Sequence, residues 1–239
     1  MRTALLLLAT LLAACANEEG PRLANTRPGL NVARAALAGG SPDIALNVSN
    51  GILAKEPRNV PALLTQADAL TLLDRPDEAG ASYAKALANN PDSSDAKIGL
   101  GRLQLRSDPV QAQASFLSVL EREPRNKIAL NNLGIAFDLQ GDHAKAQDAY
   151  RRALGLDPSM RAAEVNMALS MALSGHAADA VQMLRPIAEL PAAPPRMRHD
   201  LAVALTLAGD QQGAARVLNG DLTPEQVQRA LLAYRELSP

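Results

Sequence analysis

An alanine recurs along this chain with a period of 34 residues. The six positions are Ala45, Ala79, Ala112, Ala146, Ala180 and Ala214, so the successive intervals are 34, 33, 34, 34 and 34 residues. Eleven or twelve residues before each alanine lies a glycine or another alanine, and four residues after it lies Ser49, Tyr83, Phe116, Tyr150, Leu184 or Leu218. A fixed period of this length is typical of stacked helix–turn–helix units. The sequence therefore predicts an all-α solenoid.

The recurring positions also predict how each unit packs. Two helices approach closely where both carry small side chains, so the Gly or Ala of the first helix is expected to face the Ala of the second. Glycines 40, 141, 175 and 209 fall between the two helices of a unit, where a left-handed residue is needed to end the first helix. The predicted units are 26–59, 60–93, 94–126, 127–160, 161–194 and 195–222, the third being one residue short.

The unit 127–160 resembles the tetratricopeptide-repeat consensus almost position by position. Its first helix carries Leu130, Leu133, Gly134 and Phe137, and its second carries Ala146, Tyr150 and Ala153. The resemblance implies a tetratricopeptide array over 26–222, with about six units. A further helix over 223–239 is expected to close the stack, since Thr223, Pro224 and Gln226 fit a helix start with a capping box.

The N-terminus has the pattern of an exported lipoprotein. A short positive segment precedes an apolar run over residues 4–14, which is too short to span a bilayer and has the proportions of a secretory signal. The run ends in Leu12-Ala13-Ala14-Cys15, which resembles the lipobox whose cysteine is acylated after cleavage. We therefore expect a signal peptide at 1–14 and an acylated Cys15 with a flexible tether at 15–25. An ordinary export signal, with Cys15 incidental, is the alternative.

Composition and motifs argue against catalysis and against nucleic-acid binding. Removal of residues 1–14 would change the formal net charge from −1 to −2, whereas a nucleic-acid binder needs a basic surface. The chain has no Gly-rich phosphate loop and no nucleophile elbow, and we expect its carboxylates to be scattered over the surface. His143, His176 and His199 lie in three different units without a metal-binding spacing, so we expect surface positions for them and no metal or cofactor.

Binding of a protein segment is the remaining function class. In the tetratricopeptide family the first helices of the units line the inner surface of the array. Residues on these helices that the packing leaves over form the predicted groove: Arg34, Asp68, Arg102, Arg106, Asn131, Ile135, Leu169 and His199. The arginines are expected to contact carboxylates of the bound segment.

The C-terminal segments 201–210 (LAVALTLAGD) and 221–227 (DLTPEQV) resemble the TadD family of tight-adherence (Flp) pilus lipoproteins. The resemblance implies an outer-membrane lipoprotein on the periplasmic face, held by its lipid anchor, that assists assembly of the pilus secretin. Ala16 after the cysteine fits the sorting rule for the outer membrane. A periplasmic scaffold for other clients is the alternative, such as peptidoglycan hydrolases, outer-membrane barrel assembly or cytochrome maturation. A third function class, an enzyme, is disfavoured because the sequence lacks a catalytic motif.

Overall fold

The computed structural model describes residues 26–190 and 192–237, and every regular element in this part of the chain is a helix. The helices fall into a first compact unit up to Asn89 and a second from Asn90 onward. The first unit contains α1 (Thr26–Ala38), α2 (Pro42–Leu53), α3 (Val60–Leu72) and α4 (Pro76–Asn89). The second contains α5 (Ser94–Gln104), α6 (Pro109–Leu120), α7 (Lys127–Leu139), α8 (His143–Leu156), α9 (Arg161–Leu173), α10 (Ala177–Ala188), α11 (Pro195–Leu207), α12 (Gln211–Leu218) and α13 (Pro224–Arg235). The predicted signal peptide, Cys15 and tether lie outside the described residues.

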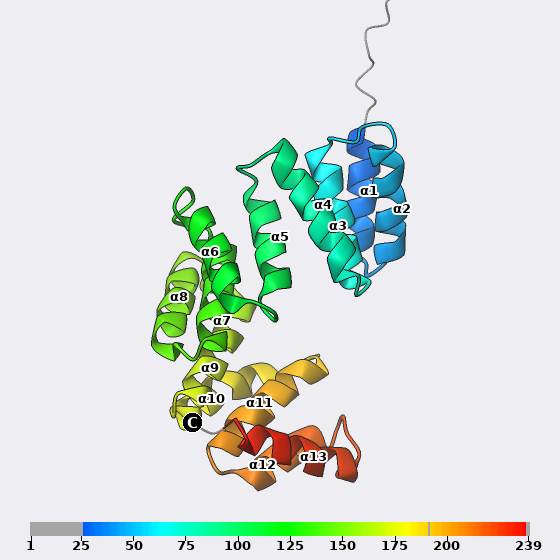
Figure 1. Ribbon diagram of the computed structural model, residues 1–239. Coiled ribbons are helices and arrows are strands. Elements are labelled where there is room, and N and C mark those ends of the chain that lie inside the picture. The colour runs from blue at the N-terminus through cyan, green and yellow to red at the C-terminus, as the bar shows by residue number, and fades with distance from the viewer. Residues whose placement is uncertain (1–25, 191, 238–239) are drawn as a thin grey trace, which may run out of the picture. The chain divides into compact units, whose positions relative to one another are not determined.

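Within each unit the packing follows chain order. Each helix packs on the next, and each odd-numbered helix also packs on the next odd-numbered one (Figure 1). The odd-numbered helices are the first helices of the predicted pairs, and the even-numbered ones are the second helices. This pattern is the helix–turn–helix stacking that the period indicates, so the predicted all-α repeat fold is confirmed.

The predicted repeat register is also confirmed. All six periodic alanines have no exposed surface, and the residues four positions later are at most 1% exposed. Even Ser49, the polar member of that second set, is fully buried, and its hydroxyl donates a hydrogen bond to the carbonyl of Leu46. Burial of a hydroxyl is tolerated because this bond satisfies it.

Two of the small residues on the first helices, Gly101 and Gly134, lie closest to a side chain other than the expected alanine. A Cβ atom added at Gly134 would lie 2.4 Å from Cε1 of Tyr150, and one added at Gly101 would lie 2.7 Å from Cε1 of Phe116. The nearest atoms to both glycines thus belong to an aromatic ring of the second helix, and not to the periodic alanine. Glycine fits here because an aromatic ring occupies the space that a Cβ atom would take.

The turns within the pairs are as predicted. Gly40, Gly141, Gly175 and Gly209 all have positive φ, from 70° to 88°. In the second pair, which has no glycine at this place, Asp74 takes the left-handed conformation with φ 56°. Aspartate adopts this conformation more readily than most residues, because its short polar side chain can hydrogen-bond locally.

The last helix starts as the sequence predicts. Thr223 is the N-cap of α13, Pro224 occupies its first turn, and Gln226 completes a capping box. Val227 and Leu231 are buried against the core formed with α9 to α12. Arg198 of α11 holds the loop before α13 in place. Its guanidinium donates two 2.6 Å hydrogen bonds to the carboxylate of Asp221 in that loop.

Candidate protein-binding face

The candidate binding face is the surface of the first helices of the second unit, α5, α7, α9 and α11. Arg102 near the end of α5 and Arg106 just after it are both exposed. Ile135 of α7 and Leu169 of α9 are half-buried and are separated by one repeat of 34 residues. One further repeat leads to Val203 of α11, which is also half-buried. This face, called the first-helix face below, therefore carries an aliphatic row with arginines on its first helix.

Two polar contacts between neighbouring first helices run beside this aliphatic row. Nδ2 of Asn166 on α9 donates to Oδ1 of Asn131 on α7 over 3.0 Å, so the two amides pair. Nδ1 of His199 on α11 lies 3.1 Å from the hydroxyl of Tyr234 on α13. In both cases the partners are 35 residues apart. Asn131, one of the predicted groove residues, is thus buried, and its side chain links α7 to α9.

The first unit contains the remaining two predicted groove residues. Arg34 on α1 is exposed. Asp68 on α3 is half-buried, and its Oδ1 accepts a 2.5 Å hydrogen bond from the hydroxyl of Tyr83 on α4. Since Tyr83 is only 1% exposed, this bond satisfies a buried hydroxyl. The Asp68 carboxylate therefore links the two helices of its own pair.

A comparable link in the second unit, made from a different position of the repeat, was not predicted from the sequence. Asp138 near the end of α7 accepts hydrogen bonds from the hydroxyls of Tyr150 (2.8 Å) and Ser170 (2.6 Å), and its Oδ1 lies 2.8 Å from Nδ1 of His143. Burial, followed by the charge of Asp138, raises the pKa of the Tyr150 hydroxyl, so it stays a donor. Asp138 thereby connects α7, α8 and α9.

The predicted surface positions of the histidines and carboxylates need a correction. His143 and His199 were expected to be solvated, but both are half-buried and have polar partners, and only His176 is exposed. Asp138 and Asp200 are likewise not surface carboxylates, since their side chains are 16% and 13% exposed. Residue type and spacing give no signal for these positions, because helix packing decides which polar side chains meet, both within a repeat and between neighbouring repeats.

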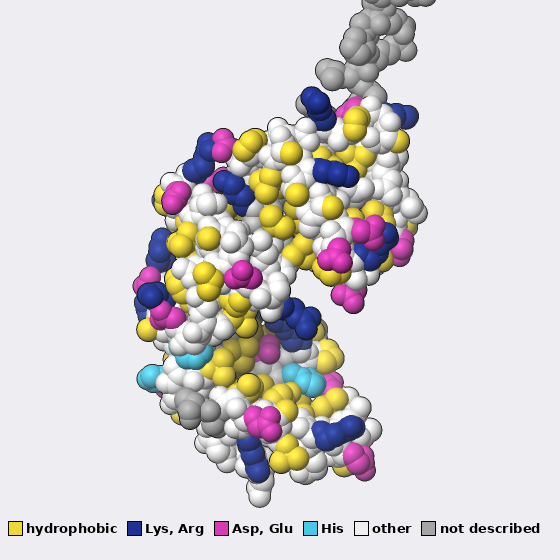
Figure 2. Space-filling view, viewed as in Figure 1, with side chains coloured by type: hydrophobic (Ala, Val, Ile, Leu, Met, Phe, Trp, Pro, Cys, Tyr) yellow, Lys and Arg dark blue, Asp and Glu magenta, His cyan; other side chains and the backbone are white. Residues whose placement is uncertain are grey.

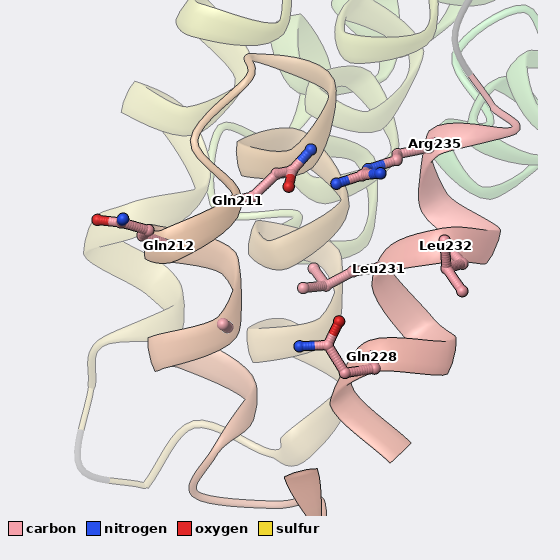
Figure 3. Close-up of a pocket in the computed structure, with 7 residues that line it drawn as sticks. Gln211, Gln212, Gln228, Leu231, Leu232 and Arg235 are labelled. Atoms are coloured by element: carbon pink, nitrogen blue, oxygen red, sulfur yellow. The ribbon is translucent and has the colours of Figure 1, made fainter. Parts of the chain in front are cut away.

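Two cavities lie away from the first-helix face. One, of about 260 Å³, lies between α12 and α13 and is lined by Gln211, Gln212, Ala215, Gln228, Leu231, Leu232 and Arg235. Figure 3 shows Gln211 and Arg235 pointing toward each other at this site. The other, of about 310 Å³, is lined by Arg185, Glu189, Gly213, Arg216 and Val217 of α10 and α12. Both are open surface depressions with several exposed side chains.

The described residues contain no group of three or more His, Cys, Asp or Glu side chains that could hold a metal ion. Within the same residues, none of the helices combines the length and apolar character needed to cross a membrane. On the side shown in Figure 2, basic and acidic side chains are interspersed. This distribution agrees with the near-neutral net charge.

Solved structures of similar fold include tetratricopeptide-repeat proteins and pilus factors. PilW, described as a widely conserved type IV pilus biogenesis factor, is 22% identical with a TM-score of 0.73 over 86% of this chain and 98% of its own. A tetratricopeptide repeat protein from Parabacteroides merdae is 17% identical with a TM-score of 0.70, covering 95% and 90%. PilF of Pseudomonas aeruginosa is 17% identical with a TM-score of 0.66, covering 88% and 95%. At these identities the likeness shows the fold.

Sequence comparison gives the family directly. No curated protein matches the chain. A tetratricopeptide-repeat family model matches residues 30–94, 64–108 and 106–161, which together span more than half of the sequence. The matched segments contain four of the six periodic alanines, all of them fully buried in the structure. The chain belongs to the tetratricopeptide-repeat family.

Proposed function

We propose that this protein is a non-catalytic, protein-binding scaffold, anchored by a lipid to the periplasmic face of the outer membrane, that assists assembly of a tight-adherence (Flp) pilus. The observation that carries the binding role is the first-helix face of the second unit. There a half-buried aliphatic row, Ile135, Leu169 and Val203, lies beside side-chain amides and follows two exposed arginines. Apolar contact area with a few polar groups at its border is what a groove for a peptide segment requires.

The pilus assignment is supported by the C-terminal segments that resemble TadD, by the lipobox pattern at Cys15 and by similarity in fold to PilW and PilF. The secretin is the client that the TadD resemblance favours. Under the alternative, the same face binds another periplasmic client, such as a peptidoglycan hydrolase.

The lipid anchor can be tested through its sulfur atom. Acylation forms a thioether, so Cys15→Ser should abolish incorporation of a lipid label and leave the chain unprocessed or mislocalised. Membrane fractionation after labelling with a fatty-acid analogue measures both effects. If the wild-type protein were processed normally and recovered as a soluble, unlabelled periplasmic protein, the anchor would be rejected.

The pilus role and the binding face are tested separately. Deletion of the gene should leave secretin multimers scarce or misplaced, as seen by immunoblotting of unheated membranes. Normal pili in that strain would reject the pilus role.

The double variant Arg102→Glu/Arg106→Glu should weaken secretin binding by about 1–3 kcal/mol, because reversed charges would repel carboxylates of the bound segment. Its control is Arg151→Glu/Arg152→Glu, an identical charge change at two exposed positions on the second helix α8. The measurement is binding of purified secretin by the full-length protein in detergent. Equal affinity of both double variants would exclude the arginines from the binding face.

A further inference from the structure

Asp200 interrupts the series of polar contacts between the first helices of the second unit. The repeat places Asp200 of α11 at the position of Asn166, and Val165 of α9 at the position of Asn131. The pairs on either side are bonded, Asn131 to Asn166 and His199 to Tyr234. Between them, the side chain at the partner position is valine, which is 2% exposed and has no polar atom.

The preceding repeat shows how an amide adapts to the same situation. Asn132 of α7 also has an apolar residue, Ile98 of α5, at its partner position. Its Nδ2 donates a 2.8 Å hydrogen bond back to the carbonyl of Ile128. An ionised carboxylate has no proton to donate and cannot make this bond. Asp200 therefore has neither the amide partner of Asn166 nor the backbone carbonyl bond of Asn132, its two equivalent residues.

The surroundings of Asp200 compensate its charge only in part. Among residues 26–190 and 192–237, its Oδ2 is the only buried side-chain nitrogen or oxygen without a hydrogen-bond partner. Nε of Arg196 is 4.0 Å away, and that side chain is 77% exposed. Burial raises the pKa of the Asp200 carboxyl above its usual range, although Arg196 and His199 act in the opposite direction. A buried carboxylate that is compensated only in part is unfavourable in the unbound protein, so a cation that reached it would be favoured.

Asp200 is also placed where a bound segment would reach it. It lies one turn before Val203 of the aliphatic row and next in sequence to His199. Its Oδ2 is buried, and 13% of the side chain as a whole remains exposed to an approaching group. Burial, followed by the charge of Asp200, raises the pKa of the Tyr234 hydroxyl. A cationic side chain that approached from the first-helix face would meet the Asp200 carboxylate next to the turn that carries His199, whose ring contacts Tyr234.

We propose that Asp200 is the anchor for a lysine or arginine side chain of the bound protein segment, next to aliphatic residues of that segment that contact Leu169 and Val203. The inference rests on the proposed protein-binding role and adds the chemistry of one contact. The bound segment would be of mixed charge, with carboxylates toward Arg102 and Arg106 and a cation at Asp200. A charge-assisted bond to a largely buried carboxylate is the type of contact that sets register and specificity.

The test uses the full-length protein in detergent and a library of random 12-residue peptides displayed on phage. Wild-type protein should enrich peptides with a lysine or arginine beside aliphatic residues. Asp200→Asn should lose the preference for the basic residue, because the amide is neutral. The control is Asp179→Asn, the same change at an exposed position on α10, which should select the same peptides as the wild type.

An enriched peptide, made synthetically, then measures the contact. Its affinity should fall at least about tenfold on Asp200→Asn, and replacing the peptide's basic residue by methionine should have little further effect in that variant. The Asn variant should melt at the wild-type temperature or above it, since a buried charge that is compensated only in part is removed.

The outcomes separate the two proposals. Peptides enriched without a basic residue, or bound equally by Asp200→Asn, would overturn the anchor and leave the scaffold role intact. A lower melting temperature with unchanged peptide selection would assign Asp200 a structural role only, and would likewise overturn the anchor. Failure of wild-type protein to enrich any peptide would reject both the anchor and the peptide-binding face.

Discussion

Replacing Asp138 by alanine is expected to destabilise the protein by about 2–5 kcal/mol. The carboxylate accepts the hydrogen bonds of Tyr150 and Ser170, which are 1% and 0% exposed, and it contacts His143. Removal of the acceptor leaves two buried hydroxyls without a partner, and an unsatisfied buried polar group costs about 1–3 kcal/mol each. Chemical denaturation of the full-length protein, followed by circular dichroism, measures the change.

The control for this prediction is Asp148→Ala on α8. Asp148 makes only an exposed ion pair with Arg151, with both side chains at least 60% exposed, so its loss should change stability by less than about 0.5 kcal/mol. Adding Tyr150→Phe to Asp138→Ala should recover part of the lost stability, because one unsatisfied hydroxyl is then removed. A loss no greater than that of the control would refute the network as a source of stability.

The second large effect is expected at Gly134. An alanine Cβ would lie 2.4 Å from the ring of Tyr150, well inside van der Waals contact, so Gly134→Ala should cost about 1–3 kcal/mol by overpacking. The ring cannot move aside easily, because it is buried and its hydroxyl is held by Asp138. This loss should exceed the gain in helix propensity that alanine brings, which is about 1 kcal/mol or less.

Gly155→Ala on α8 provides the matched comparison. It is the same substitution in a helix of the same pair, but no atom lies within 4 Å of the added Cβ. The variant should therefore gain about 0.5–1 kcal/mol from reduced backbone freedom. Thermal or chemical unfolding of both variants gives the comparison. Stabilisation of similar size at both positions would mean that the Tyr150 ring does not pack on Gly134.

Several features of this protein were determined by its sequence alone. The 34-residue period assigned the helix pairs and the buried positions, and all six periodic alanines are fully buried. The left-handed turns at Gly40, Gly141, Gly175 and Gly209 and the capping box at Thr223 were likewise predictable. These features depend on backbone conformation and on contacts within one repeat. Such local requirements leave a signal in residue type and spacing.

Only the tertiary structure decided which polar side chains of the first helices are engaged inside the fold. The sequence does not distinguish Asp68 and Asp138 from exposed carboxylates. Each nevertheless accepts a hydrogen bond from the hydroxyl of a buried tyrosine on the following helix. The pairing of Asn131 with Asn166, and the missing pairing of Asp200, depend on a residue 35 positions away in the neighbouring repeat. Whether a polar group is satisfied depends on the atoms that helix packing brings next to it. Residue type and spacing along the chain do not show which atoms those are.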